Sequence, residues 1–233
     1  MNHAEPLART PGLREPLLLS WSGGKDSCLA LRELLQLPQW QVVALLSTIT
    51  EGYERLSMHG VRAELIRAQA ASLGLKLLEA RIPRQATNLV YEAALQDAVQ
   101  PFLAHGVRFL AFGDLFLEEI RHYREKLLAR WGMEAVFPLW GRNTTAISQQ
   151  FLADGFRAVV VCVDPRQIPA ELCGCEYDER FLAALPPNAD PCGENGEFHT
   201  FVYHGPMFRA PIAVRRGATV HRDGFVFCDL LPH

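Results

Sequence analysis

The stretch Ser22-Gly-Gly-Lys-Asp-Ser27 combines residue types that bind phosphate groups. It follows a short apolar run and precedes a segment of helical periodicity, so we expect it between a strand and a helix. Gly23 and Gly24 allow the backbone to approach an anion closely, and the first amides of a helix attract negative charge. Ser22 and Ser27 add hydroxyl donors, and Lys25 adds a positive charge. The stretch therefore predicts a phosphate-binding loop.

Asp26 distinguishes this loop from the Walker A loop. A Walker A loop needs a glycine five positions before its Gly-Lys pair and a Ser or Thr directly after the lysine. Leu19 and Asp26 occupy those positions here. A carboxylate beside phosphates is repulsive unless a cation lies between them, so Asp26 predicts a bound Mg²⁺. The predicted ligand is a polyphosphate together with its metal ion.

A second stretch, Pro191-Cys-Gly-Glu-Asn-Gly-Glu-Phe-His-Thr200, places two carboxylates three residues apart. Gly193 and Gly196 argue against a helix, so we expect a tight loop before a strand. In such a loop Glu194 and Glu197 can bind a second metal ion, hold an ammonium ion or act as a general base. An acidic surface turn has the same composition. The residues alone leave these alternatives open.

The elements that position these stretches alternate between strand and helix over the first half of the chain. We expect strands at 16–21, 40–48, 76–83 and 107–115 and helices at 26–37, 59–75 and 86–106. This order predicts an α/β fold with a parallel, doubly wound sheet covered by helices on both faces.

The second half of the chain changes character. Expected there are a helix at 118–132, a short strand at 133–140, a helix at 143–155 and strands at 156–164, 198–208 and 218–230, the last with a hairpin turn at Asp223-Gly224. We therefore predict three segments: a disordered lead-in over 1–15, a nucleotide-binding domain over 16–131 and a smaller C-terminal α/β domain over 132–233.

Polar residues that follow the expected strands add to the candidate site, because ligands of open α/β sheets bind at the carboxyl edge. Asp114 comes after Gly113 at the end of the strand at 107–115, and it suits metal binding, substrate contact or helix capping. His59 follows the strand at 40–48, where it would cap a helix or contact the substrate.

Composition and charge argue against a nucleic-acid-binding protein and against a membrane protein. The formal net charge is -3 and the sequence pI is about 6.2, which gives no strong signal for nucleic-acid binding. No apolar run approaches the ~20 residues of a membrane helix, so we expect a cytoplasmic protein without membrane contact. Of the six cysteines, only Cys173 and Cys175 lie close together, and one Cys-x-Cys pair is a weak zinc signal.

The Ser-Gly-Gly-x-Asp-Ser pattern resembles that of the N-type ATP pyrophosphatases, which share the PP-loop and the HUP fold. Three further stretches narrow the resemblance: Phe-Gly-Asp-Leu-Phe-Leu-Glu-Glu-Ile-Arg-His-Tyr at 112–123, Val-Phe-Pro-Leu-Trp-Gly-Arg at 136–142, and the glycine-rich segment at 190–208. Together they resemble the diphthine–ammonia ligase family over residues 17–230. The chain departs from the family pattern at Asn195, where Gly is usual, and at His199, where Glu is usual.

The resemblance implies an ATP-dependent amide ligase that releases AMP and pyrophosphate. An acceptor carboxylate is adenylated and then attacked by ammonia. The implied acceptor is a protein side chain or a small carboxylate, and the family's named acceptor is diphthine on translation elongation factor 2. The implied site comprises Lys25, Glu194 and Glu197 for catalysis, Ser22, Gly23, Gly24, Lys25, Asp26, Ser27, Thr48 and Gly113 for ATP, His59, Asp114, Asn195, Gly196 and Thr200 for the substrate, and Asp26 for Mg²⁺.

Two other readings of the same loop stay open. A tRNA-modifying enzyme uses the same ATP chemistry, although it would call for a basic surface. A non-catalytic adenine-nucleotide sensor would need no acidic loop at 194–197. Self-association as a homodimer is also left open by the sequence.

Overall fold

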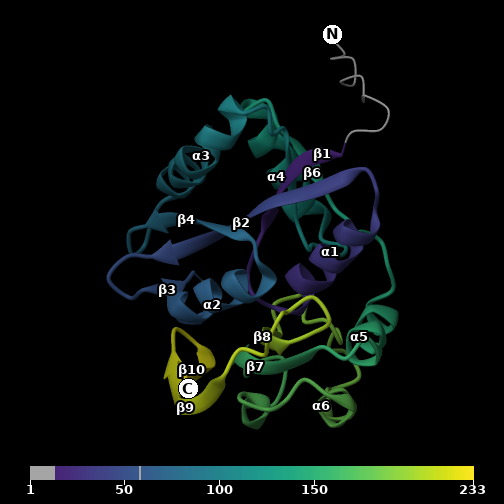
Figure 1. Ribbon diagram of the computed structural model, residues 1–233. Helices are drawn as coiled ribbons and strands as arrows, with labels where there is room; N and C mark the ends of the chain where they lie inside the picture. Colours follow the sequence, from purple (N-terminus) through teal and green to yellow (C-terminus); the bar gives the residue numbers. More distant parts are fainter. Residues whose placement is uncertain (1–13, 58) are drawn as a thin grey trace.

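The computed structural model describes residues 14–57 and 59–233 (Figure 1). Most of the lead-in expected over 1–15 lies outside these residues. The first strand, β1, spans Glu15–Ser20, so it begins at the last residue of the expected lead-in.

The first sheet, sheet A, has a parallel core in the order β4-β2-β1-β5-β6. Leu45 of β2 lies between Leu19 of β1 and Leu77 of β4, which fixes this order. A short strand that the sequence did not predict, β3, pairs antiparallel with the end of β2. The remaining strands are β2 (Trp40–Thr50), β3 (Arg55–Leu56), β4 (Lys76–Ile82), β5 (Phe109–Ala111) and β6 (Glu134–Val136).

Helices cover both faces of sheet A, which confirms the doubly wound parallel fold (Figure 1). Because alternate residues of a strand point to opposite faces, Leu17 and Leu19 pack with α1 and α2, whereas Leu18 packs with α3 and α4. The helices are α1 (Lys25–Gln36), α2 (Ala63–Leu73), α3 (Asn88–Ala104) and α4 (Glu118–Arg130). No helix within the described residues is long and apolar enough to cross a membrane.

The second sheet, sheet B, is antiparallel in the order β8-β7-β10-β9. Asp223 and Gly224 have φ values of 53° and 83°, so the expected hairpin turn joins β9 to β10. Sheet B carries α5, which is capped by Asn143, whose side chain accepts from the amide of Ala146. It also carries a short α6 that the sequence did not predict. The elements are α5 (Thr144–Ala153), β7 (Arg157–Val163), a 3₁₀ turn at Ala170–Leu172, α6 (Glu179–Ala184), β8 (Phe198–His204), β9 (Val214–Arg222) and β10 (Phe225–Pro232).

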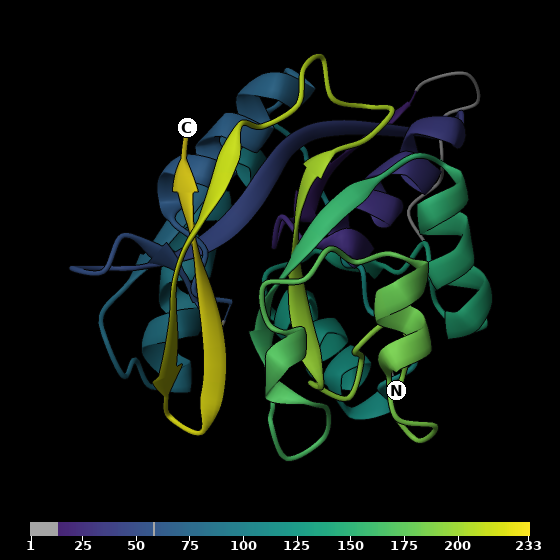
Figure 2. The same cartoon turned by 90° about the horizontal axis from the view of Figure 1, so that it is seen from below.

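The two sheets share one hydrophobic core. The cluster that holds Leu17 and Leu19 of sheet A continues through α1 to Val160 and Phe201 of sheet B. Figure 2, seen from below, shows the second sheet in front of the first. Sheet A also extends past residue 131, because β6 pairs with β5. The domain boundary that the sequence predicts at residue 131 stays a prediction.

Candidate functional site

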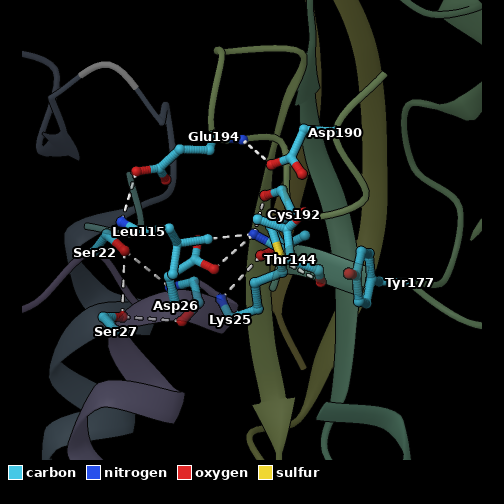
Figure 3. A network of polar contacts seen from close by, with 12 residues as sticks. Ser22, Lys25, Asp26, Ser27, Leu115, Thr144, Tyr177, Asp190, Cys192 and Glu194 are labelled. Carbon is cyan, nitrogen blue, oxygen red and sulfur yellow. Dashed lines mark hydrogen bonds and ion pairs between the residues drawn. The ribbon is translucent and has the colours of Figure 1, made fainter. Parts of the chain in front are cut away.

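The phosphate loop, residues 22–27, connects β1 to α1 as the sequence predicts. Gly23 has a φ of 70°, which favours glycine, and Gly24 is the N-terminal cap of α1. Ser22 Oγ accepts from the amide of Gly24 at 3.2 Å and lies 3.3 Å from Ser27 Oγ. Ser27 Oγ donates to the carbonyl of Gly24 at 2.9 Å. These contacts hold the loop around the start of the helix, where its amides can face an anion (Figure 3).

Strand β8 completes the phosphate loop from the other end of the chain. The amide of Val202 donates to the carbonyl of Gly23 at 2.9 Å, and the amide of Lys25 donates to Thr200 Oγ1 at 3.0 Å. A Cβ atom on Gly24 would lie 3.0 Å from the Thr200 carbonyl oxygen, so the second glycine permits this close packing. Thr200, which we expected to contact the substrate, thus supports the loop while it borders the site.

Gln69 of α2 is a loop-supporting residue that the sequence analysis missed. Its side chain is fully buried, and its Nε2 donates to the carbonyls of Gly23 at 2.9 Å and Val202 at 2.6 Å. Its Oε1 accepts from Trp21 Nε1 at 2.9 Å. The sequence signal for this role is a polar residue on the same helix face as Ile66, which is expected to be buried. A buried side-chain amide needs specific hydrogen-bond partners, so its position indicates a structural contact.

Lys25 and Asp26 form an ion pair inside the site. Lys25 is 3% exposed, and its Nζ lies 2.9 and 2.7 Å from the two carboxylate oxygens of Asp26. The same Nζ donates to the carbonyl of Cys192 and lies 5.5 Å from the centre of the Phe198 ring. Burial is the largest single effect on the pKa of Lys25 and lowers it, but the charge and hydrogen bond of Asp26, together with Cys192 and Glu194, more than offset this and leave the pKa raised. Lys25 therefore keeps its positive charge within the phosphate loop.

The acidic loop, residues 190–197, faces the phosphate loop (Figure 3). Tyr177 anchors it by donating from its hydroxyl to the carbonyl of Pro191 at 2.7 Å. Glu194 Oε1 accepts from the amide of Leu115 at 2.7 Å. Burial raises the pKa of Glu194 from 4.5 to about 7, the Leu115 amide lowers it, and the charge of Asp26 adds to the rise. Glu194 is thus a carboxyl group that can exchange a proton near neutral pH.

Glu197 lies elsewhere, although the sequence analysis gave it the same role as Glu194. It is 2% exposed and does not border the cavity. Its Oε1 accepts from the amide of Asp190 at 2.8 Å and from Asn195 Nδ2 at 3.1 Å. The side chain of Asn195 is therefore directed at Glu197, while Gly196, with a φ of 83°, borders the cavity. In this arrangement Glu197 holds the acidic loop together.

Two adjoining cavities make up the site. The smaller, about 210 Å³, lies between the phosphate loop and the acidic loop, and the larger, about 680 Å³, extends between the ends of the strands and α3 and α4. Thr48 borders the larger cavity. Residues common to both cavities mark their junction: Ser20, Ser22, His59, Phe112 and Arg124.

Gly113 and Asp114 follow β5 and border the smaller cavity as the sequence predicts. A Cβ atom on Gly113 would lie 2.9 Å from the carbonyl carbon of Asp26, so the glycine allows β5 to meet the start of α1. Asp114 Oδ1 accepts from Arg124 Nη2 at 3.0 Å, and its Oδ2 lies 2.6 Å from Arg124 Nε. Asp114 therefore positions an arginine at the junction of the cavities.

Metal-binding clusters are absent from the part of the chain that the structure describes: no three His, Cys, Asp or Glu side chains gather as a ligand set. All six cysteines are free thiols, and Cys173 Sγ donates to the carbonyl of Val226 at 3.3 Å. Asp26 is the carboxylate within the phosphate loop itself, and it borders the smaller cavity.

The protein has a parallel sheet with a phosphate loop after its first strand, and the acidic loop of the second sheet lies against that phosphate loop. These two features define a PP-loop protein of the HUP fold. Residues 17–135 match the diphthamide synthase N-terminal domain, and residues 143–230 match the diphthamide synthase C-terminal domain. The chain belongs to the diphthamide synthase family. The first matched range includes β6, in keeping with its place in sheet A.

Curated relatives carry the name diphthine–ammonia ligase. The chain is 25% identical to the one from Bos taurus over 231 residues and 24% identical to the one from Homo sapiens over 231 residues, each covering 90% of this chain and 86% of the relative. It is 24% identical to the one from Schizosaccharomyces pombe over 228 residues, and it spans 38% of the length of that protein. These findings confirm the resemblance seen in the motifs.

Proposed function

We propose that this protein is an ATP-dependent ligase that adenylates an acceptor carboxylate and then converts it to an amide with ammonia. The observation that carries the proposal is the position of Glu194, a carboxyl group with a pKa of about 7, in the same cavity as the phosphate loop. The names of the relatives support diphthine as the acceptor. A cytoplasmic location is part of the same proposal.

The first step forms the acyl-adenylate. An oxygen of the acceptor carboxylate bonds to the α-phosphorus of ATP, and the bond to the β-phosphate breaks, so that pyrophosphate leaves. The amides at the start of α1 and the charge of Lys25 stabilise the negative charge of the departing pyrophosphate. Because the carboxylate of Asp26 borders the cavity and carboxylates suit Mg²⁺, Asp26 is the residue that would hold this ion. When bound, Mg²⁺ neutralises charge on the phosphates.

The second step needs a neutral nitrogen nucleophile. Ammonium has no lone pair, so a base must first remove a proton. Glu194 fits this role, because a catalytic group is most effective when its pKa lies near the working pH. Ammonia then attacks the acyl carbon, AMP leaves with the electron pair of the broken carbon–oxygen bond, and the nitrogen releases one proton to solvent to give the amide. Glu197 acts through the shape of the acidic loop, since its carboxylate is hydrogen-bonded within that loop.

The test is incubation of the purified protein with ATP, ¹⁵N-ammonium and elongation factor 2 that carries diphthine. The expected products are AMP, pyrophosphate and an acceptor whose carboxylate has become a ¹⁵N-amide, detected by mass spectrometry. Formation of ADP and phosphate would contradict the proposal. A parallel incubation with cell extract identifies a different acceptor through its ¹⁵N label.

Glu194→Gln and Glu197→Gln are a matched pair for the second step. Loss of a general base costs ~10²–10⁴-fold in rate, so Glu194→Gln should lose amide formation while it still binds ATP. Glu197→Gln keeps the acceptor oxygen for Asp190 and Asn195 and should retain more activity than Glu194→Gln. The reverse ranking would reassign the base to Glu197.

A further inference from the structure

His59 stands at the junction of the two cavities and has no assigned role in the steps above. It borders both the smaller cavity, which holds the phosphate loop, and the larger one. If the terminal phosphates of ATP bind the phosphate loop and the adenosine extends into the larger cavity, the α-phosphorus lies at this junction. Adenylation breaks the bond at that phosphorus, so His59 lies beside the reacting atoms.

The turn that carries His59 is fixed by residues from both ends of the chain. Arg55 donates from Nη1 to the carbonyl of Gly60 at 2.7 Å and to Asp229 Oδ1 at 2.8 Å. A Cβ atom on Gly60 would lie 3.0 Å from the ring of Phe227 in β10. Gly60, the residue after His59, is therefore held against the hairpin of β9 and β10, which suits a residue that must meet a substrate in a set position.

The environment of the His59 ring keeps it neutral. Burial lowers the pKa of His59 well below its usual value, and His199 of β8 and Lys25 of α1 lower it further. The His199 ring lies 4.2 Å from the His59 ring, measured between centroids. Burial likewise lowers the pKa of His199 to about 4, so the pair carries no charge near pH 7. A neutral imidazole has one N–H donor and one lone pair.

The burial of the ring nitrogens indicates where that donor lies. His59 Nδ1 is buried and has no hydrogen-bond partner among the described residues. An orphaned buried N–H group is rarer than an unpaired acceptor, so the proton belongs on Nε2. Because Nδ1 is covered, Nε2 is the nitrogen left to face the cavities. His59 thus presents a neutral N–H donor at the junction.

We propose that His59 is a further catalytic residue, which donates a hydrogen bond from Nε2 to a non-bridging oxygen of the α-phosphate during adenylation. The inference rests on the proposed function and deepens it. As the carboxylate oxygen bonds to phosphorus and pyrophosphate departs with its electron pair, negative charge gathers on the non-bridging oxygens. A fixed donor stabilises that charge without any proton transfer to or from His59. His199 acts as a positioning residue through its ring contact.

The test compares His59→Gln with His59→Asn. A glutamine amide reaches the position of Nε2, whereas an asparagine amide reaches only that of Nδ1, so the pair differs in donor position and little in chemistry. The readouts are the rate of pyrophosphate–ATP exchange with diphthine-bearing elongation factor 2 in the absence of ammonium, and the affinity for Mg-ATP by calorimetry. The wild-type protein in the same assay reports on the proposed function, and the ratio of variant to wild type reports on His59.

We expect His59→Asn to slow exchange by ~10²–10³-fold and His59→Gln to restore most of that rate, with the Mg-ATP affinity of both near that of the wild type. The exchange rates of wild type and His59→Gln should vary with pH in the same way between pH 6 and 8, because neither donor titrates. His122→Asn, at an exposed histidine of α4, is the control and should be fully active. Equal rates for His59→Gln and His59→Asn, or a loss of Mg-ATP affinity that matches the loss of rate, would overturn the inference.

Discussion

Replacement of Glu194 by glutamine should change how the stability of the protein depends on pH. The folded-state pKa of Glu194 is about 7, above the ordinary value of 4.5. Below pH 4.5 the carboxyl is protonated in the folded and unfolded chains alike and has no effect. Between pH 4.5 and about 7 the unfolded chain loses this proton while the folded chain keeps it, so stability falls as pH rises. Above pH 7 the penalty is constant.

The size of this penalty follows from the difference between the two pKa values. The interval from 4.5 to about 7 corresponds to about 3.4 kcal/mol, at about 1.36 kcal/mol for each tenfold change in proton affinity. Glu194 is only half-buried, so solvent screening reduces the expected value to about 1–2 kcal/mol. Glutamine carries no charge, and its carbonyl can still accept from the amide of Leu115. The variant should therefore escape the penalty.

The assay is urea unfolding of the wild type and Glu194→Gln at pH 4, 6 and 8, without nucleotide. Relative to the wild type, the variant should gain about 1–2 kcal/mol between pH 4 and pH 8, mostly above pH 5. The measurement at pH 4 is the internal control, since the wild-type carboxyl is then protonated in both states. A stability difference that is the same at pH 4 and pH 8 would refute the burial and repulsion assigned to Glu194.

Further predictions concern the phosphate loop and its supports. Asp26→Asn should weaken Mg-ATP by roughly one to two decades, about 1.5–3 kcal/mol, and AMP much less; calorimetry giving equal losses would remove Asp26 from the metal role. Gln69→Leu should destabilise the fold by several kcal/mol, because it removes the amide that donates to the Gly23 and Val202 carbonyls and leaves the buried indole N–H of Trp21 without its acceptor; thermal unfolding measures this. Gly113→Ala should cost about 1–3 kcal/mol and weaken ATP binding, since its Cβ meets the backbone of α1, and an unchanged melting temperature would contradict that packing.

The architecture was predictable wherever a segment carried its own periodicity. The parallel sheet and its four helices followed from buried runs that alternate with amphipathic stretches. Strand β3 and helix α6 were missed, because two and six residues are too few to show a period. Helix α2 was expected from residue 59 but begins at Ala63, since the chain first forms β3 and the turn that carries His59.

The site was predictable where its chemistry is local in sequence. The phosphate loop is set by six consecutive residues, and the structure places it as expected. Glu194 and Glu197 could not be separated, because the conformations of Gly193 and Gly196 decide which carboxylate faces the cavity. Gln69 could not be assigned to the loop either, since its partners Gly23 and Val202 lie 46 and 133 residues away.

Because β8 completes the phosphate loop, the nucleotide site can form only late in the synthesis of the chain. The amide of Lys25 finds its partner Thr200 only after another 175 residues have been made. At ~5–20 residues per second, this interval lasts roughly 10–35 s on the ribosome. During that time β1 and α1 exist without the strand that fixes the loop, so a nascent chain has the motif but not the finished site. Because such distant contacts also slow refolding, ATP binding should be among the last properties to return after denaturation.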